Sequence, residues 1–194
     1  MSLPPGLLVW KTTQLPATYA DLEALPPDKI GELIGGVLYA SPRPSMLQSA
    51  ATGDLLGELY HPFFKGRGGP GGWLFLFMSE LHLGGDVLVP DVAGWRRERM
   101  PRIPDAQGMT VAPDWVCEVL SPSTAALDRD KKLTVYAREG IRHVWLVDPR
   151  PRTLEVLRLE GAHYLRLATW AGEATVRAEP FDALALELRV LWED

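Results

Sequence analysis

Two carboxylates and a lysine stand out in this sequence because their neighbours predict burial. Glu118 lies within the apolar run Trp115–Leu120, and Asp91 lies within the similar run Val87–Ala93, while Lys132 follows in the next predicted helix. An unpaired buried carboxylate is costly, so each acid needs a partner, a proton or a metal ion. Two carboxylates with a nearby ammonium could hold a divalent cation and act on a phosphoryl group.

Both acids are predicted to lie on apolar faces of strands. Because side chains alternate between the faces of a strand, Glu118 shares a face with Val116 and Leu120, and Asp91 shares one with Ala93. An alternative for either residue alone is an acid at a strand end that reaches water or caps a helix. The two together favour a shared cation, because adjacent carboxylates raise each other's pKa unless a cation joins them.

Asp114 is the competing acid. It precedes Glu118 on what reads as the same strand, and at about 3.3 Å per residue their Cα atoms would lie roughly 13 Å apart. That separation is too large for the two to share one metal ion easily. Asp91, on a different predicted strand, can lie directly beside Glu118.

The lysine is selected by helical phase. Residues 123–140 predict a helix that starts at Ser or Thr and ends at Gly140. Its apolar stripe consists of Ala126, Leu133, Tyr136 and Ala137. At about 100° per residue, Lys132 falls at the edge of this stripe and Lys131 points nearly opposite. An edge lysine can deliver its ammonium into a cleft; the alternative is a surface lysine paired with Asp128.

The elements that must position these groups alternate along the chain. A short helix is expected after Thr18, a strand pair around Gly35-Gly36, and a strand pair, residues 73–83 and 86–95, around Gly84-Gly85. The helix after Pro44 carries Leu47, Ala51, Leu55 and Leu59 at helical spacing. Further strands are expected at 143–149, 153–159, 163–170 and 174–179. This order predicts an α/β or α+β fold around one mixed sheet.

Composition narrows the class of protein. The 194 residues are expected to form one domain, 1–194, and the 46% hydrophobic and 23% charged residues are typical of a soluble globular protein. No apolar run approaches a membrane span, no secretory signal is recognised, and the single cysteine excludes an internal disulfide, so a cytoplasmic location is expected. The net charge of −5 argues against a nucleic-acid binder without excluding a local basic cleft.

Three ordered segments carry a resemblance to a known family. They read "GELIGGVLYASPRP", "PDVAGW" and "PDWVCEVLSPSTAALDRDKKLTVYAREGIRHVWLVDP". With them the chain, from about Tyr19 to the C-terminal "FDALALELRVLW", resembles the Uma family of "putative restriction endonucleases" in the PD-(D/E)XK superfamily. The resemblance implies a restriction-endonuclease-like mixed β-sheet flanked by helices, with a metal-dependent phosphodiesterase centre on the sheet.

The resemblance also assigns roles by position. Asp91 matches the aspartate of the PD motif, and Glu118 matches the acid of the second half-motif. The usual lysine of that half-motif would stand at Leu120, and Lys132 matches the lysine that replaces it from the following helix. Asp91, Glu118 and Lys132 are therefore the expected catalytic residues, with Asp91 and Glu118 as ligands of Mg²⁺ or Mn²⁺.

Two further residues are expected in the same cleft. Glu32 matches an acidic position, and Gln48 is a candidate for a polar contact; the histidine that often precedes this glutamine in the family is Leu47 here. The arginine-rich run 96–102 could touch phosphates or form a solvated loop.

The function expected from residues and resemblance is a Mg²⁺- or Mn²⁺-dependent endonuclease that hydrolyses DNA. The alternative is a nucleic-acid-binding or assembly module on the same fold, with weak or no catalysis. The acidic net charge and the missing half-motif lysine favour that alternative. A hydrolase of small molecules is less favoured, and a homodimer is the default expectation for assembly.

Overall fold

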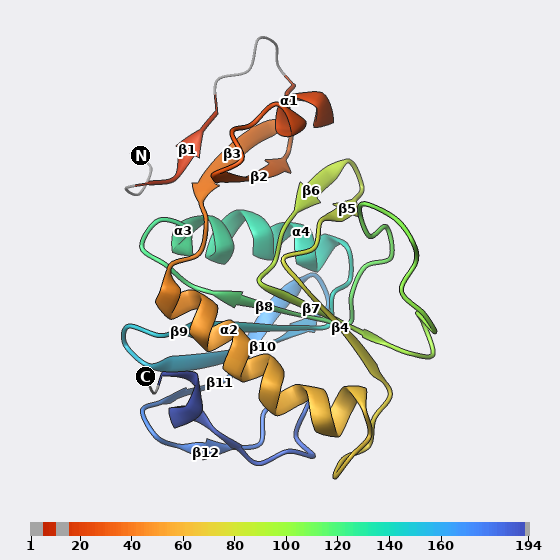
Figure 1. The fold of residues 1–194 in the computed structure, drawn as a ribbon, viewed down its shortest axis with the longest axis vertical. Helices are drawn as coiled ribbons and strands as arrows, with labels where there is room; N and C mark the ends of the chain where they lie inside the picture. Colours follow the sequence, from red (N-terminus) through yellow and green to blue (C-terminus); the bar gives the residue numbers. More distant parts are fainter. Residues whose placement is uncertain (1–5, 11–15, 193–194) are drawn as a thin grey trace.

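The computed structural model describes residues 6–10 and 16–192. In this part of the chain the strands form a six-stranded sheet, a five-stranded sheet and a two-stranded ribbon. The six-stranded sheet has a long helix on one side and a helix from the middle of the chain on the other, and the five-stranded sheet extends from one end (Figure 1). The mixed sheet flanked by helices is confirmed, but the expectation of a single sheet is wrong.

The six-stranded sheet holds most of the predicted central strands. Its order is β11-β10-β9-β8-β7-β4. The bounds are β4 (Trp73–Phe77), β7 (Val92–Arg96), β8 (Trp115–Val119), β9 (His143–Asp148), β10 (Thr153–Glu160) and β11 (His163–Ala171). Strands β8 and β9 are parallel and every other neighbouring pair is antiparallel, so the sheet is mixed.

One face of this sheet is covered by helix α2 (Met46–Leu59), which continues into a π-helical turn, η1 (Tyr60–Phe64). Ser45 starts α2 as its N-cap, in a capping box with Gln48. Ala51, Leu55 and Leu59 recur every four residues and are fully buried against the sheet, as their spacing predicts. Leu47, expected on the same stripe, is exposed instead.

The opposite face is covered by the helix that crosses from β8 to the parallel strand β9. It consists of α3 (Ala125–Leu127), a π-helical turn η2 (Asp128–Lys132) and α4 (Leu133–Arg138). Gly140, with φ at +73°, follows its end as predicted. The predicted stripe is wrong at Ala126, which is exposed; Leu127, Val135 and Tyr136 are the buried apolar residues of this helix.

The five-stranded sheet, in the order β1-β3-β2-β6-β5, is built from the first half of the chain. Its bounds are β1 (Leu8–Val9), β2 (Lys29–Ile34), β3 (Val37–Pro42), β5 (Leu81–Leu83) and β6 (Asp86–Leu88). The predicted hairpin between β2 and β3 turns at Gly35 and Gly36, whose φ angles of +59° and +74° suit glycine. Helix α1 (Tyr19–Glu23) starts after Thr18 as expected and packs on this sheet through Leu22.

The strand pair expected at 73–83 and 86–95 is divided between the two sheets. The first strand breaks at Met78, whose φ is +48°, and the second breaks at 89–91, before β7. Consequently β4 pairs with β7 in the six-stranded sheet, whereas β5 pairs with β6, across Gly84-Gly85, in the five-stranded sheet. This correction places Asp91 at the junction of the two sheets rather than inside a strand.

The C-terminal segment completes the core on the α2 side. Strands β12 (Thr175–Val176) and β13 (Leu186–Glu187) form the ribbon, and η3 (Leu188–Leu191) is a short 3₁₀ helix. Phe181, between them, packs on the rings of Trp73, Trp115 and Trp145. Within residues 6–10 and 16–192, no helix has the length and apolarity needed to span a membrane.

Candidate active site

Glu118 lies on the floor of the candidate site because of strand alternation in β8. Cys117 and Val119 face the core under α2, whereas Val116, Glu118 and Leu120 face the crossover helix. The Glu118 side chain is 2% exposed. Its Oε1 accepts a hydrogen bond from the Tyr136 hydroxyl at 2.5 Å. The predicted burial of this acid on an apolar face is therefore observed.

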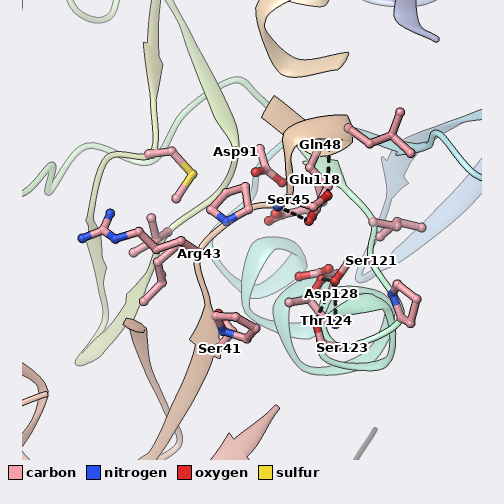
Figure 2. A pocket seen from close by; sticks show the side chains of 18 of the residues that line it. Ser41, Arg43, Ser45, Gln48, Asp91, Glu118, Ser121, Ser123, Thr124 and Asp128 are labelled. Carbon is pink, nitrogen blue, oxygen red and sulfur yellow. Dashed lines mark hydrogen bonds between the residues drawn. The ribbon is translucent and has the colours of Figure 1, made fainter. Parts of the chain in front are cut away.

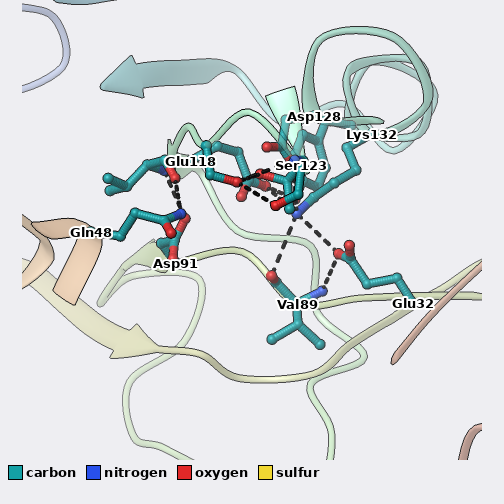
Figure 3. Close-up of polar contacts among 12 residues, drawn as sticks. Glu32, Gln48, Val89, Asp91, Glu118, Ser123, Asp128 and Lys132 are labelled. Atoms are coloured by element: carbon teal, nitrogen blue, oxygen red, sulfur yellow. Dashed lines mark hydrogen bonds and ion pairs between the residues drawn. The ribbon is translucent and has the colours of Figure 1, made fainter. Parts of the chain in front are cut away.

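Lys132 brings its ammonium into the same place. Its side chain is 3% exposed, and Nζ lies 2.9 Å from Glu118 Oε1, 3.0 Å from Glu32 Oε1 and 3.3 Å from Asp128 Oδ1. The carbonyl oxygen of Val89 is 3.4 Å away. Figure 3 shows the ammonium between these groups. An ammonium has three donors, so these contacts occupy all of them.

Lys131 behaves as helical phase predicts. Its side chain is 54% exposed, and its ammonium lies 3.9 Å from the exposed carboxylate of Asp130. The two neighbouring lysines therefore differ completely in environment. That contrast makes Lys131 a matched control for any substitution of Lys132.

Glu32 reaches the site from the five-stranded sheet. It lies in β2, and its Oε1 accepts the backbone N–H of Val89 at 2.8 Å in addition to the contact with Lys132. Val89 belongs to the segment that connects β6 with β7. Glu32 and Lys132 thus tie the junction of the two sheets to the crossover helix.

Asp128 is the site residue whose burial sequence reasoning missed. It was considered only as a surface partner of Lys132, one turn away, yet its side chain is 4% exposed. Its burial could have been inferred from spacing, because Asp128, Lys132 and Tyr136 follow one another at four-residue intervals on one face of the helix. The helix thus carries the carboxyl group of Asp128, the ammonium of Lys132 and the phenol of Tyr136 on the side that faces the site of Glu118.

Asp91 and Gln48 hold the end of strand β8. Asp91 Oδ2 accepts the backbone N–H of Val119 at 2.7 Å, and Gln48 Nε2 donates to the Val119 carbonyl at 2.8 Å. Continuing the β7–β8 register, in which Val92 lies opposite Cys117, would put Asp91 opposite Glu118. Because β7 begins only after Asp91, no residue of β7 pairs with Val119. The side chains of Asp91 and Gln48 form hydrogen bonds with the N–H and the carbonyl of Val119 instead.

The electrostatics of the site are dominated by burial. Burial raises the pKa of Asp91 to about 7, although the Val119 N–H and Lys132 act in the opposite direction. Burial also raises the pKa of Glu118 well above its ordinary range and raises that of Asp128. Burial alone would lower the pKa of Lys132, but the surrounding carboxylates, led by Glu118, raise it well above its ordinary value. The ammonium is therefore charged, and carboxyl groups outnumber it.

The carboxylates face a cavity of about 530 Å³ (Figure 2). Hydroxyl groups of Ser121, Ser123 and Thr124 line one wall, and Arg43 and Arg150 line the cavity as well. Arg43 is anchored through hydrogen bonds of 2.8 and 3.1 Å to the carbonyl oxygen of Pro27. The cavity therefore offers an anionic floor with hydroxyl and cationic groups around it.

The donor chemistry suits a hard divalent cation. Within residues 6–10 and 16–192, Asp91 Oδ1 and Glu118 Oε2 accept no hydrogen bond, so each acid keeps one oxygen for a ligand. No group of three His, Cys, Asp or Glu side chains in that part of the chain is arranged to hold a metal ion. A cation here would depend on two carboxylates, with water or phosphate completing its shell, which is how Mg²⁺ is usually held.

Two other candidates from the sequence lie elsewhere. Asp114 accepts hydrogen bonds from the Arg96 N–H and the Arg99 guanidinium, at the end of β7 opposite Asp91. In the arginine-rich run, Arg96 stacks on Trp73 and Arg97 on Phe64. Neither the competing acid nor this run lines the cavity over Glu118.

Comparison with known proteins agrees with this fold. A family model described as "Uma2: Putative restriction endonuclease" matches residues 16–190. A crystal structure described as "a putative nuclease belonging to DUF820", from Anabaena variabilis ATCC 29413, has a TM-score of 0.73 and 23% sequence identity. It covers 90% of this chain and 97% of its own, so the two share a fold. No curated protein matches the chain.

Removal of the buried ammonium should destabilise the metal-free protein. Lys132→Ala leaves Glu32, Glu118 and Asp128 buried without a cation, so the free energy of unfolding should fall by about 3–5 kcal/mol. Lys131→Ala should change it by less than about 0.5 kcal/mol. Urea unfolding of both variants at pH 7 with a chelator measures the difference. A loss below about 1 kcal/mol for Lys132→Ala would contradict the buried charge cluster.

Stability should also depend on pH through Asp91. Burial raises the pKa of Asp91 in the folded protein from its ordinary value of 3.8 to about 7, so Asp91 stabilises the fold at low pH, and this contribution is lost as the pH rises from about 3.8 through about 7. Between about pH 5.5 and 7.5 this amounts to about 2 kcal/mol. Chelated Asp91→Asn protein should therefore lose less stability over this interval than chelated wild type in urea unfolding. Parallel pH curves would show that Asp91 does not titrate as described.

Proposed function

We propose that this chain, which belongs to the Uma2 family, is a metal-dependent nuclease that hydrolyses phosphodiester bonds of DNA at the site of Asp91, Glu118 and Lys132. The observation that carries the proposal is the contact between Lys132 and Glu118 at the floor of a cavity where carboxyl groups outnumber cations. The three residues also stand at the positions that the family resemblance assigns to catalysis.

Asp91 and Glu118 would hold the divalent cation. When bound, such a cation offsets the charge of the scissile phosphate and lowers the pKa of a coordinated water. The two carboxylates are held in place for this task by the Val119 N–H and by the Tyr136 hydroxyl. The surplus of carboxyl groups over the ammonium favours the binding of a cation, which would replace the protons that burial retains on these acids.

Lys132 would stabilise the negative charge that develops on the phosphoryl group or orient the attacking water. All three of its donors are engaged in the metal-free protein, so one contact must be exchanged for the substrate. The longest contacts, to Asp128 at 3.3 Å and to Val89 O at 3.4 Å, are the ones most readily exchanged. Glu32 and Glu118 would then keep the ammonium in place.

A second candidate function is supported by the same engagement of Lys132. A non-catalytic nucleic-acid-binding or assembly module on this fold would show the same two features. Its lysine would be fully paired with carboxylates, as Lys132 is, and it would lack the half-motif lysine, as this chain does at Leu120. Such a module would bind nucleic acid without cutting it. Cleavage and binding assays of the same variants distinguish the two functions.

Cleavage should depend on Glu118 although folding does not. Glu118→Gln keeps the size of the side chain and leaves Lys132 with Glu32 and Asp128, so its stability should stay within about 1 kcal/mol of wild type. With Mg²⁺ or Mn²⁺, its cleavage of plasmid and oligonucleotide DNA should fall by about 100-fold or more. Lys131→Ala is the control and should retain most of the activity. Equal cleavage by wild type and Glu118→Gln would assign the activity to another site or another protein.

Metal should stabilise the fold through Asp91. With a dissociation constant of about 1 mM, about 10 mM Mg²⁺ should add about 1.4 kcal/mol. For a chain of this length that raises the melting temperature by about 3–6 °C, and Mn²⁺ should give at least as much. Asp91→Ala should abolish the shift, whereas Asp114→Ala, at the far end of β7, should keep it. Thermal melts of the three proteins with and without metal measure this, and an equal shift in all three would place the cation elsewhere.

A further inference from the structure

A second groove lies between helix α2 and the edge strand β4. It is an open groove with a volume of about 380 Å³, lined by Leu56, Gly57, Tyr60, His61, Phe75 and Phe77. Two of its rings reach the surface: Phe77 is 66% exposed and Tyr60 is 38% exposed. This volume falls within the range of about 300–1,000 Å³ of small-molecule sites. Neither the hydrophobic core nor the candidate active site accounts for these exposed rings.

The groove is flanked by positive charge. The Lys65 ammonium lies 5.3 Å from the centre of the Tyr60 ring. Phe64, which lies outside the groove lining, stacks on Tyr60 with 4.5 Å between the ring centres, and the Lys65 ammonium and the Arg97 guanidinium each lie 4.9 Å from the centre of the Phe64 ring. Residues 59–79, which supply η1 and β4, contain no Asp or Glu, although the chain has 25 acidic residues. Although the protein carries net negative charge, this segment has no acidic residue, and cations lie close to its aromatic rings.

The groove continues from the candidate active site. Phe77 pairs with Val92, the neighbour of Asp91. The next residue, Met78, lines the active-site cavity and donates its N–H to the Asp91 carbonyl. At this point a residue that lines the groove, Phe77, and a residue that lines the active-site cavity, Met78, are consecutive in the chain.

Helix α2 provides a second connection. Gln48, Thr52, Leu56 and Tyr60 follow one another at four-residue spacing along α2 and into η1. The first lines the active-site cavity, and the last two line the groove. At 1.5 Å per residue this stripe is about 18 Å long. Because each four-residue step turns about 40° around the axis, the row winds about 120° around the helix, so α2 borders the cavity near its first turn and the groove near its last turns.

We infer that this groove binds a single-stranded segment of the nucleic acid whose phosphodiester bond lies at the Asp91–Glu118 site. The inference rests on the proposed function. Exposed aromatic rings offer stacking surfaces to unpaired bases, which a base-paired duplex keeps stacked within itself, and adjacent cations bind the phosphates. Phe77 and Tyr60 provide the rings, and Lys65 and Arg97 provide the charges.

The test is the binding of a fluorescein-labelled oligo-dT, followed by fluorescence anisotropy with a chelator so that no cleavage occurs. Phe77→Ala should weaken binding by about tenfold through loss of one stacked base. Lys65→Ala should reduce the slope of log affinity against log salt by about 0.7, the contribution of one phosphate contact to a single strand. Two controls remove an exposed apolar side chain and an exposed ammonium elsewhere: Leu165→Ala on β11 and Lys131→Ala. Both should bind as wild type does.

Three outcomes would overturn the inference. They are no binding of oligo-dT by wild type, equal affinity for Phe77→Ala and Leu165→Ala, and a dimer that Phe77→Ala converts to monomer while oligo-dT binding stays unchanged. The last would make the groove a contact between two copies of the chain. Cleavage with Mn²⁺ is measured separately, so binding that depends on Phe77 without any cleavage would reject the proposed nuclease activity and keep the groove.

Discussion

The burial of one ammonium among three carboxylates is the constraint on which the structure depends. Lys132 contacts Glu118 on the central strand β8, Asp128 on its own helix and Glu32 on the five-stranded sheet. Each charge alone would be costly to bury, and a broken buried pair costs several kcal/mol. The helix and both sheets must therefore keep their relative positions for any one of these charges to be tolerated.

The cluster stabilises the arrangement of the chain, but its single ammonium does not balance all of its carboxyl groups. The carboxyl groups exceed the single ammonium, and burial raises the pKa values of Asp91, Glu118 and Asp128. The sheet is also open at this point, because side chains of Asp91 and Gln48 take the hydrogen bonds of Val119 in place of a neighbouring strand. An open strand end with surplus carboxylates is poorly suited to structure alone and well suited to a cation and an anionic substrate.

Much of the site could be predicted from the sequence because local periodicity decides it. Alternation in β8 placed Glu118 on the face of Leu120, and helical phase separated Lys132 from Lys131. Asp128 was missed because an acid one turn from a lysine usually lies in solvent, and only the sheet above it makes that position buried. Ala126 was misplaced because the π-helical turn changes the phase within one helix.

The division into two sheets could not be predicted from local pattern. Ser79-Glu80 and Pro90 interrupt the apolar runs where the strands break, but which of the two sheets each half joins depends on contacts made by distant residues. Glu32 binds the Val89 N–H, and the Asp91 side chain replaces strand pairing at Val119. These hydrogen bonds join backbone groups to side chains that are distant in the sequence, so a short stretch of sequence does not reveal them.

The proposed site requires that Asp91 and Glu118 together hold a divalent cation beside Lys132. The most direct measurement is an anomalous difference map from crystals of the wild-type chain soaked in Mn²⁺ and recorded at a wavelength where manganese scatters anomalously. We expect one peak at coordination distance from an oxygen of each carboxylate, with Lys132 still paired to Glu118. A manganese peak elsewhere, with Asp91 and Glu118 free of metal and unchanged, would contradict it.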